Sequence, residues 1–196
     1  MIAIVDYGMG NLHSVSKGLQ RVGAEIKIVS APAELQKADK IVLPGVGAFD
    51  DAVVCLQQSG MAEALLDAIG KGTPLLGICL GMQMLFEGSA EGKLAGLGIF
   101  KERILQFDGQ QKVPHMGWNT VEPLRGCPLY KGIGQFYAYF VHSYYPPFAE
   151  GYAASRTCYG LPFASSVWQD NVFATQYHPE KSGDVGLRVL QNFSRI

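Results

Sequence analysis

The residue best suited to catalysis is Cys79, a cysteine that lies between two glycines. The segment Gly77–Gly81 (GICLG) has the form G-x-S-x-G with cysteine in place of serine, and it follows an apolar run. On a sharp strand-to-helix turn the backbone at the nucleophile is strained, so its close neighbours must be small. Such a turn exposes the Cys79 sulfur and aims backbone N–H groups at the group it attacks. The alternative is a buried structural cysteine at a strand end.

A thiol nucleophile needs a base, and the base needs a third group that fixes its tautomer. Of the four histidines, only His178 ends a β-prone segment and is followed by Pro-Glu. Pro179 favours extended backbone at His178, and residues two apart on extended backbone point the same way. We therefore predict that His178 is the base and that Glu180 orients it. The alternative is an ordinary strand exit with a solvated carboxylate.

Attack on an amide places negative charge on its oxygen, which needs preorganised donors worth roughly 3–4 kcal/mol each. The segment Pro44–Gly47 (PGVG) offers a glycine-rich loop whose N–H groups could turn inward. We predict oxyanion donors at Val46 and Gly47, together with the N–H of Leu80 beside the cysteine. A plain tight turn is the alternative for this loop.

Strands and helices alternate around these motifs in the first half of the chain. Apolar runs predict strands at 2–5, 25–30, 41–43 and 74–78, with helices at 11–22, before 58 and at 61–69. The third strand is expected to stop at Pro44. Continuous apolar strands in this rhythm indicate an α/β fold with a mostly parallel sheet covered by helices on both faces.

The second half is rich in strands. Alternating or aromatic runs at 98–105, 113–121, 136–142, 151–157, 163–168 and 172–177 predict antiparallel strands and hairpins. These strands either extend the first sheet or form a second one. A last helix is expected at 185–193. No linker divides the chain, so we expect residues 1–196 to form one domain.

Composition narrows the class of protein further. A length of 196 residues suits one core, and 48% hydrophobic with 17% charged residues is typical of a globular chain. A net charge of -1 does not favour nucleic acid or an anionic membrane as a partner. The start Met1–Asp6 has no basic segment typical of a secretory signal. The apolar run Pro74–Phe86 is too short to span a bilayer.

Four cysteines, Cys55, Cys79, Cys127 and Cys158, are widely and irregularly spaced. No two form a zinc-type pair, and the spacing suggests no disulfide framework. Reduced thiols in a cytoplasm are the simplest interpretation. We expect no metal and no cofactor.

The three motifs together resemble class I glutamine amidotransferases, in the order loop, nucleophile and His-x-Glu. The resemblance covers most of the chain and implies that Gly45, Gln83 and Glu91 help to hold glutamine. It also implies that backbone at Ser143 and Tyr144 lines the same pocket. Gln83 follows Cys79 by one turn, so both can face one cleft. Glu91 could pair with the substrate ammonium, although a solvated loop carboxylate is the alternative.

Two further segments resemble one branch of that family, the glutaminase subunits of imidazole glycerol phosphate synthase. They are Asp6–Val15 (DYGMGNLHSV) and Val113–Asn119 (VPHMGWN). Ammonia in water becomes mostly ammonium, so it must pass directly to an acceptor site. We expect residues 1–196 to form one domain, which leaves no second domain for that chemistry. The resemblance implies a heterodimer with a (βα)8-barrel cyclase subunit. It also implies that four residues face this partner: Asn11, Trp118, Tyr139 and Lys181. The alternatives are, in the same order, a helix N-cap, a core aromatic, a strand aromatic and a solvated lysine.

Three rival functions remain open from the residues. Gly8 and Gly10 begin a G-x-G-x-x-G dinucleotide pattern, but His13 occupies the third glycine position. A stand-alone cysteine hydrolase or redox sensor would use the same turn without a partner. A sister glutaminase, such as the small subunit of anthranilate synthase, shares the triad motifs but not the Asp6–Val15 segment.

Overall fold

The fold is described from a computed structural model that covers residues 1–109, 111–124 and 126–196. The first half alternates strands and helices, as expected. Its elements are β1 (Ile2–Val5), α1 (Leu12–Arg21), β2 (Ile26–Val29), α2 (Pro32–Leu35), β3 (Lys40–Gly45), α3 (Phe49–Gln58), α4 (Met61–Gly70), β4 (Leu75–Cys79) and α5 (Leu80–Gln83). The α2 and α5 helices were not predicted as separate elements, because each has only four residues.

The second half is built mainly of strands. Its elements are β5 (Phe86–Ser89), β6 (Phe100–Gln106), β7 (His115–Pro123), β8 (Phe136–His142), β9 (Tyr144–Tyr145), β10 (Ala153–Tyr159), β11 (Leu161–Gln169), β12 (Val172–Thr175) and α6 (Gly183–Ser194). Two 3-10 turns, η1 (Pro128–Tyr130) and η2 (Pro179–Lys181), complete it. Every predicted strand is present, and β5 and β9 are additional.

Within the described residues, one nine-stranded sheet runs through the molecule in the order β2-β1-β3-β4-β12-β11-β10-β7-β8. The last strand of the chain, β12, lies near the middle, parallel to β4 and antiparallel to β11. The run at 172–177 is predicted from the sequence as an antiparallel strand, and the parallel pairing of β12 with β4 corrects that prediction. A smaller three-stranded sheet, β5-β6-β9, also contains one parallel pair, between β5 and β6.

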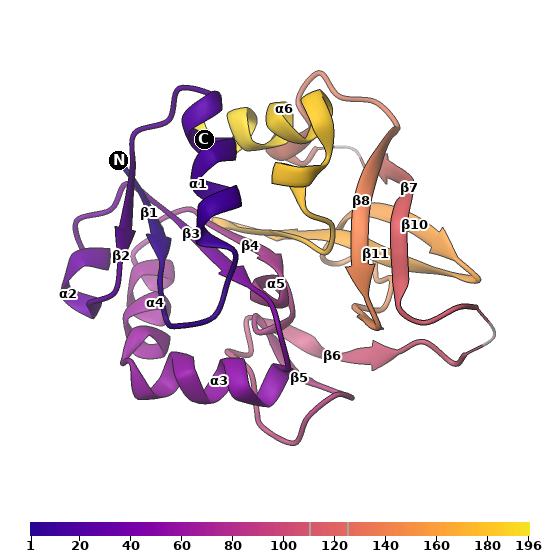
Figure 1. Cartoon of the computed structure of the whole chain (residues 1–196), viewed down its shortest axis with the longest axis horizontal. Coiled ribbons are helices and arrows are strands. Elements are labelled where there is room, and N and C mark those ends of the chain that lie inside the picture. The colour runs from indigo at the N-terminus through magenta and orange to yellow at the C-terminus, as the bar shows by residue number, and fades with distance from the viewer. Residues whose placement is uncertain (110, 125) are drawn as a thin grey trace.

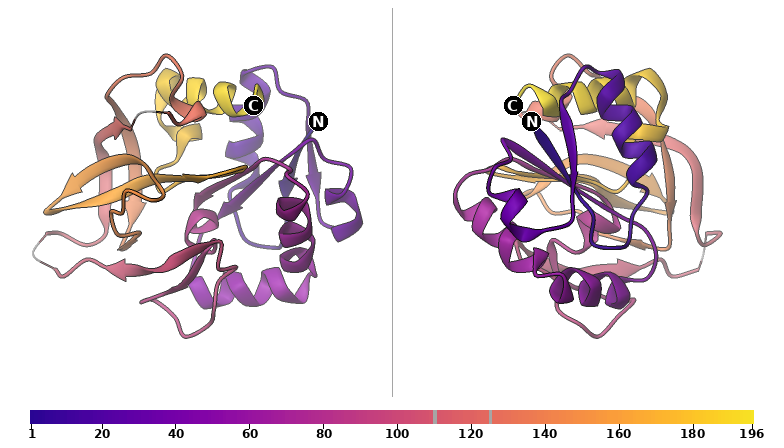
Figure 2. Two further views of the ribbon diagram at one scale, coloured as in Figure 1. Left: turned by 180° about the vertical axis from the view of Figure 1, so that it is seen from behind. Right: turned by 60° about the vertical axis from the view of Figure 1, so that its left-hand side comes forward.

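Helices cover both faces of the parallel half of the large sheet (Figures 1 and 2). Alternate residues of β1 enter opposite layers: Ala3 and Val5 join a core with α3 and α4, while Ile2 and Ile4 join a core with α1 and α6. Burial on both faces explains why the parallel strands read as continuous apolar runs. This arrangement leaves the carboxyl ends of β3, β4 and β12 free to carry loops.

The third strand continues two residues beyond its predicted end. Pro44 lacks an N–H group and was expected to stop it, yet β3 extends to Gly45. Ile41 donates its N–H toward β4, so alternation turns the Pro44 nitrogen toward β1. Pairing between β1 and β3 ends at Val42, so the missing donor leaves no ladder bond unmade. The Tyr7 hydroxyl donates to the Pro44 carbonyl at 3.1 Å and holds this strand end.

No helix among the described residues is both long enough and apolar enough to cross a membrane.

The glycine after the predicted nucleophile is required by packing. A Cβ atom on Gly81 would lie 1.9 Å from the Leu43 carbonyl oxygen, because α5 packs directly on the β3 backbone. We expect Gly81→Ala to lower the free energy of unfolding by about 3 kcal/mol or more. Urea denaturation measures it. In the control Gly70→Ala, the new methyl group meets no atom within 4 Å and should change stability by less than about 1 kcal/mol. Equal stability of both variants would contradict this packing argument.

Candidate active site

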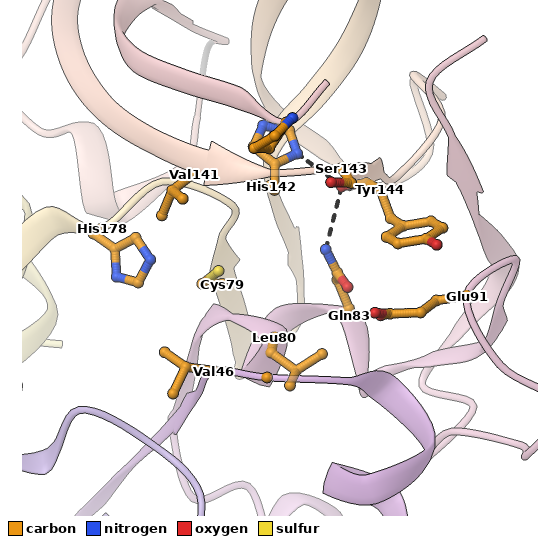
Figure 3. Close-up of a pocket in the computed structure, with 12 residues that line it drawn as sticks. Val46, Cys79, Leu80, Gln83, Glu91, Val141, His142, Ser143, Tyr144 and His178 are labelled. Atoms are coloured by element: carbon orange, nitrogen blue, oxygen red, sulfur yellow. Dashed lines mark hydrogen bonds between the residues drawn. The ribbon is translucent and has the colours of Figure 1, made fainter. Parts of the chain in front are cut away.

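A pocket of about 310 Å³ lies where β3, β4 and β8 end, and Figure 3 shows its lining side chains. It brings together residues that are far apart in the sequence. The lining residues are Val46, Gly47, Cys79, Leu80, Gln83, Glu91, Pro114, Val141, His142, Ser143, Tyr144 and His178. Most of the residues predicted from the motifs therefore share one cavity, whose volume is within the range of small-molecule sites.

Cys79 sits on the strained turn that its glycine neighbours predicted. Its φ and ψ angles are 56° and -111°, a left-handed backbone conformation that is unusual for a residue with a side chain. A Cβ on Gly77 would lie 3.0 Å from backbone atoms of Gly81 and Met82, which explains the first glycine. The sulfur enters the pocket, although Cys79 is only 8% exposed.

His178 faces the Cys79 sulfur across the pocket (Figure 3). Its Nδ1 lies 2.8 Å from Glu180 Oε1, and both side chains are almost fully buried. Because a carboxylate accepts, Nδ1 carries a proton and Nε2 is left for the sulfur. Burial lowers the pKa of His178, but hydrogen bonds and charge interactions with Cys79 and Glu180 outweigh burial and raise the pKa to about 10. The raised pKa of His178 favours transfer of a proton from the Cys79 thiol to Nε2.

The predicted oxyanion loop runs beside the nucleophile. Gly45 pairs with Cys79 in the parallel ladder, which brings Val46 next to Leu80. Val46, Gly47 and Leu80 all line the pocket, and Gly47 has a φ of 105°. Gly45 itself, predicted to touch the substrate, is not among the lining residues. A Cβ there would lie 2.6 Å from the Gly81 nitrogen, so this glycine permits close packing of α5.

Gln83 is in the pocket, but its amide nitrogen is already engaged. Nε2 donates to the Tyr144 carbonyl at 3.2 Å and to Gln176 Oε1 at 3.0 Å. Figure 3 shows its oxygen turned toward Glu91. The Gln83 oxygen is therefore the atom placed to accept from a ligand, and the nitrogen ties α5 to β9.

Glu91 reaches the pocket from the loop after β5. Its Oε2 accepts from the Phe49 N–H at 3.2 Å. Burial raises the pKa of Glu91 above its ordinary value, and repulsion by Asp50 and Asp51 adds to this effect, although the Phe49 N–H opposes it. A cationic ligand group would relieve this unfavourable burial of charge. Glu91 thus differs from the solvated carboxylate that was the alternative.

The four residues predicted to face a partner lie outside the pocket. Asn11 is the N-cap of α1, and its side chain accepts from the Ser14 N–H at 3.1 Å. Trp118 and Tyr139 are paired across β7 and β8, with ring centroids 6.3 Å apart, and Trp118 is 58% exposed. Lys181 is exposed and follows the His-Pro-Glu segment directly.

Sequence reasoning missed several residues that touch the site. Pro114, Val141 and His142 line the pocket, and Gln176 lies behind it. Two of these residues could have been found from the sequence. Pro114 belongs to the family-like segment Val113–Asn119, and His142 directly precedes Ser143 and Tyr144, which were predicted to line the pocket. Gln176 lay inside the β-prone segment before His178, where a polar residue with a buried partner cannot be told from a solvated one.

Two buried histidines support the pocket wall. His142 Nδ1 lies 2.7 Å from the Tyr144 carbonyl, and its Nε2 lies 2.9 Å from His115 Nδ1. A carbonyl only accepts, so His142 Nδ1 donates, its Nε2 accepts, and His115 Nδ1 donates. Asn119 then donates to His115 Nε2 at 3.2 Å. Both rings are neutral in this chain of bonds. Burial lowers the pKa of His115 to about 4 and of His142 to about 3.

These depressed pKa values predict acid sensitivity. Below the ordinary pKa of 6.5, the two histidines are protonated in the unfolded chain but stay neutral in the folded chain. The unfolded chain therefore binds more protons, and stability is lost as pH falls. We expect the free energy of unfolding to fall by about 2 to 4 kcal/mol between about pH 6 and about pH 4.5. Urea denaturation at each pH measures it. His178, protonated in both states over most of this range, adds little.

The double variant His115→Asn with His142→Asn should lose most of this pH slope, while the exposed-histidine control His13→Asn should keep it. An unchanged slope in the double variant would show that the loss comes from carboxylates instead.

Comparison with known proteins gives one consistent result. The family model "Glutamine amidotransferase class-I" matches residues 3–195. The "Imidazole glycerol phosphate synthase subunit HisH" of Syntrophotalea carbinolica is 48% identical over 203 residues, covering 98% of each chain. The protein of the same name from Halobacterium salinarum is 50% identical over 202 residues, covering 98% of this chain and 91% of the relative.

Solved structures agree on the fold. The structure of PurLQS from Thermotoga maritima matches with a TM-score of 0.81 and 20% identity, over 98% of this chain and 96% of that chain. A crystal structure of a glutamine amidotransferase matches with a TM-score of 0.79 and 20% identity over 100% of both chains. At these identities the likeness concerns the fold alone.

Proposed function

The chain belongs to the class I glutamine amidotransferase family, and on this premise we propose that it is the glutaminase subunit of an imidazole glycerol phosphate synthase. It hydrolyses glutamine to glutamate and supplies ammonia for histidine biosynthesis. The observation that carries the proposal is that Cys79 and His178 line one pocket and that Glu180 bonds to His178. Relatives of that name match this chain over nearly their whole length.

The pocket geometry supports a thioester mechanism. His178 Nε2 takes the proton of Cys79, and the thiolate attacks the δ-carbon of glutamine. N–H groups of Val46 and Leu80 stabilise the negative oxygen of the tetrahedral intermediate. His178 then gives its proton to the departing nitrogen, which leaves as ammonia. Water, deprotonated by His178, attacks the thioester carbon and releases glutamate and the Cys79 sulfur.

Substrate recognition follows from the opposite wall of the pocket. Glu91 offers a carboxylate to the α-ammonium of glutamine, and the Gln83 oxygen offers a second acceptor nearby. The backbone of Ser143 and Tyr144 lines the same side. The placement of two acceptors opposite Cys79 orients the side-chain amide of glutamine toward the sulfur.

We further propose that the partner is a cyclase subunit with a (βα)8 barrel. An apolar face on β7 and β8 supports a docking surface. It is formed by the exposed Met116, Trp118 and Tyr137 and the half-buried Tyr139. This face continues into the pocket through Val141. The same face contacts the segment that carries the base, because the backbone N–H of His178 donates to the Tyr139 carbonyl at 3.1 Å.

The test is the rate of glutamate release by the chain alone, and then with the cognate cyclase subunit and its nucleotide substrate. We expect the cyclase subunit and its nucleotide substrate together to raise the rate of glutamate release strongly. The nucleotide should be consumed as glutamine is hydrolysed. The variant Trp118→Ala should weaken association without removing residues of the pocket. Glutamine turnover that is equal with and without the cyclase would favour a stand-alone cysteine hydrolase.

A further inference from the structure

One buried residue behind the pocket contacts the predicted nucleophile and has no part in the mechanism above. Gln176 follows β12, two residues before His178, and its side chain is fully buried. Its Nε2 lies 3.8 Å from the Cys79 sulfur, within hydrogen-bond range for sulfur. Its Oε1 lies 3.0 Å from Gln83 Nε2. The Gln176 amide thus bridges the nucleophile strand and a residue of the substrate wall.

The direction of these bonds is fixed by a backbone carbonyl. Gln83 lies 3.2 Å from the Tyr144 carbonyl, which only accepts, so the Gln83 atom facing it is the NH2 group. The same NH2 group faces Gln176, so the Gln176 oxygen must accept from it. The remaining end of the Gln176 amide, the NH2 group, is therefore the one that faces Cys79.

The Tyr144 carbonyl is itself held in place. It also accepts from His142 Nδ1 at 2.7 Å, and His142 is supported by His115 (Figure 3 shows the bonds to Tyr144). A carbonyl oxygen has two lone pairs, and these two donors satisfy both. The orientation of Gln176 therefore rests on a buried, fully directional chain of hydrogen bonds and not on a freely rotating side chain.

We propose that Gln176 is a hydrogen-bond donor that stabilises the negative charge on the Cys79 sulfur. This role rests on the proposed function of Cys79 as the nucleophile. An amide N–H bonds a thiolate more strongly than a thiol or a thioester sulfur, because bonds to an ionised acceptor are stronger. The contribution is largest when the sulfur is charged, before attack and when it leaves the thioester.

Gln176 and His178 have complementary roles at the sulfur. His178 supplies a proton that must leave again with the ammonia, so its charge is lost during the reaction. The Gln176 amide does not transfer a proton, so its NH2 group remains a hydrogen-bond donor through every step. A neutral donor in a buried position also avoids the cost of burying a second cation beside His178.

The test uses Gln176→Met, which keeps the length of the side chain and removes the donor. The measurement is alkylation of Cys79 by iodoacetamide across pH, mapped by mass spectrometry on the full chain. The exposed Cys158 in the same molecule is an internal reference thiol. We expect Cys79 to react about three- to tenfold more slowly at pH 7 in the variant, with its pH midpoint moved upward. Cys158 should react at an unchanged rate.

Two further variants separate this role from packing. Thr175→Val removes a buried hydroxyl from the same segment, which donates to the Tyr177 carbonyl and not to Cys79. It should leave the pH midpoint of Cys79 unchanged. Gln176→Glu places a carboxylate beside the sulfur and should move the midpoint further upward than methionine does. Urea denaturation of each variant shows whether the chain remains folded.

The outcomes distinguish this inference from the proposed function. If Cys79 in the unmodified chain reacts no faster than Cys158 at neutral pH, the assignment of Cys79 as an activated nucleophile fails. If Cys79 is activated but its pH midpoint is the same with Gln176→Met, only the role of Gln176 is overturned. An equal shift with Thr175→Val would likewise overturn it, in favour of packing.

Discussion

Cys79→Ala is expected to reduce glutamine hydrolysis by on the order of 10⁴-fold or more while leaving the chain folded. The variant removes the only sulfur that lines the pocket among the described residues, and with it the covalent route to glutamate. Alanine fits the site, because it is smaller and adds no atom to the crowded turn. Glutamate release by the chain together with the proposed cyclase partner measures the loss, and urea denaturation checks the fold.

A matched thiol provides the control for this prediction. Cys158→Ala removes an exposed cysteine on β10, outside the pocket, and should leave turnover within about twofold. Both variants should bind the proposed partner equally. Substantial glutamine turnover by Cys79→Ala would show that the thioester route is wrong, whatever the position of His178.

Glu180→Gln is expected to lower kcat by about 10³- to 10⁴-fold, because the amide no longer fixes the tautomer of His178. The side chain of Glu180 is fully buried, and its bond to His178 Nδ1 is 2.8 Å long. Its negative charge is among the causes that raise the pKa of His178 to about 10. Removing that charge leaves the opposing effect of burial in place, so the pKa of His178 should fall. The pH profile of kcat/KM should then shift to lower pH.

The control is a carboxylate of similar size on the surface. Glu122 pairs with Arg156 at 2.7 Å, and both side chains are about half exposed. Glu122→Gln should leave kcat and the pH profile unchanged, since exposed ion pairs contribute little. The role of Glu180 as orienter would be refuted if Glu180→Gln retained full kcat with an unaltered pH profile.

Most of the features that were predicted correctly from the sequence depend on short local motifs. The strained turn at Cys79 follows from glycines on either side, and the orientation of Glu180 toward His178 follows from their spacing of two. Both depend on a few neighbouring residues, so sequence alone was sufficient. The parallel first half was predicted for the same reason, because buried strands are continuous apolar runs.

Contacts between distant segments could not be predicted in this way. Gln176 lies beside Cys79 only because β12 pairs with β4 in parallel, and nothing in the four residues of β12 specifies that neighbour. The strand followed a series of hairpins, which suggested another antiparallel strand. The bond between His115 and His142 similarly depends on the register of β7 against β8, where the two residues are direct partners.

The central position of β12 affects how the protein is made. The ribosome delivers Cys79 well before His178, and the strand leading to His178 must insert between β4 and β11, which are already synthesised. Among the described residues, β12 is the strand that joins the two halves of the large sheet. A nascent chain released before residue 172 therefore lacks both β12 and the imidazole of His178. Such incomplete translation products should not hydrolyse glutamine and should release no ammonia in the cell.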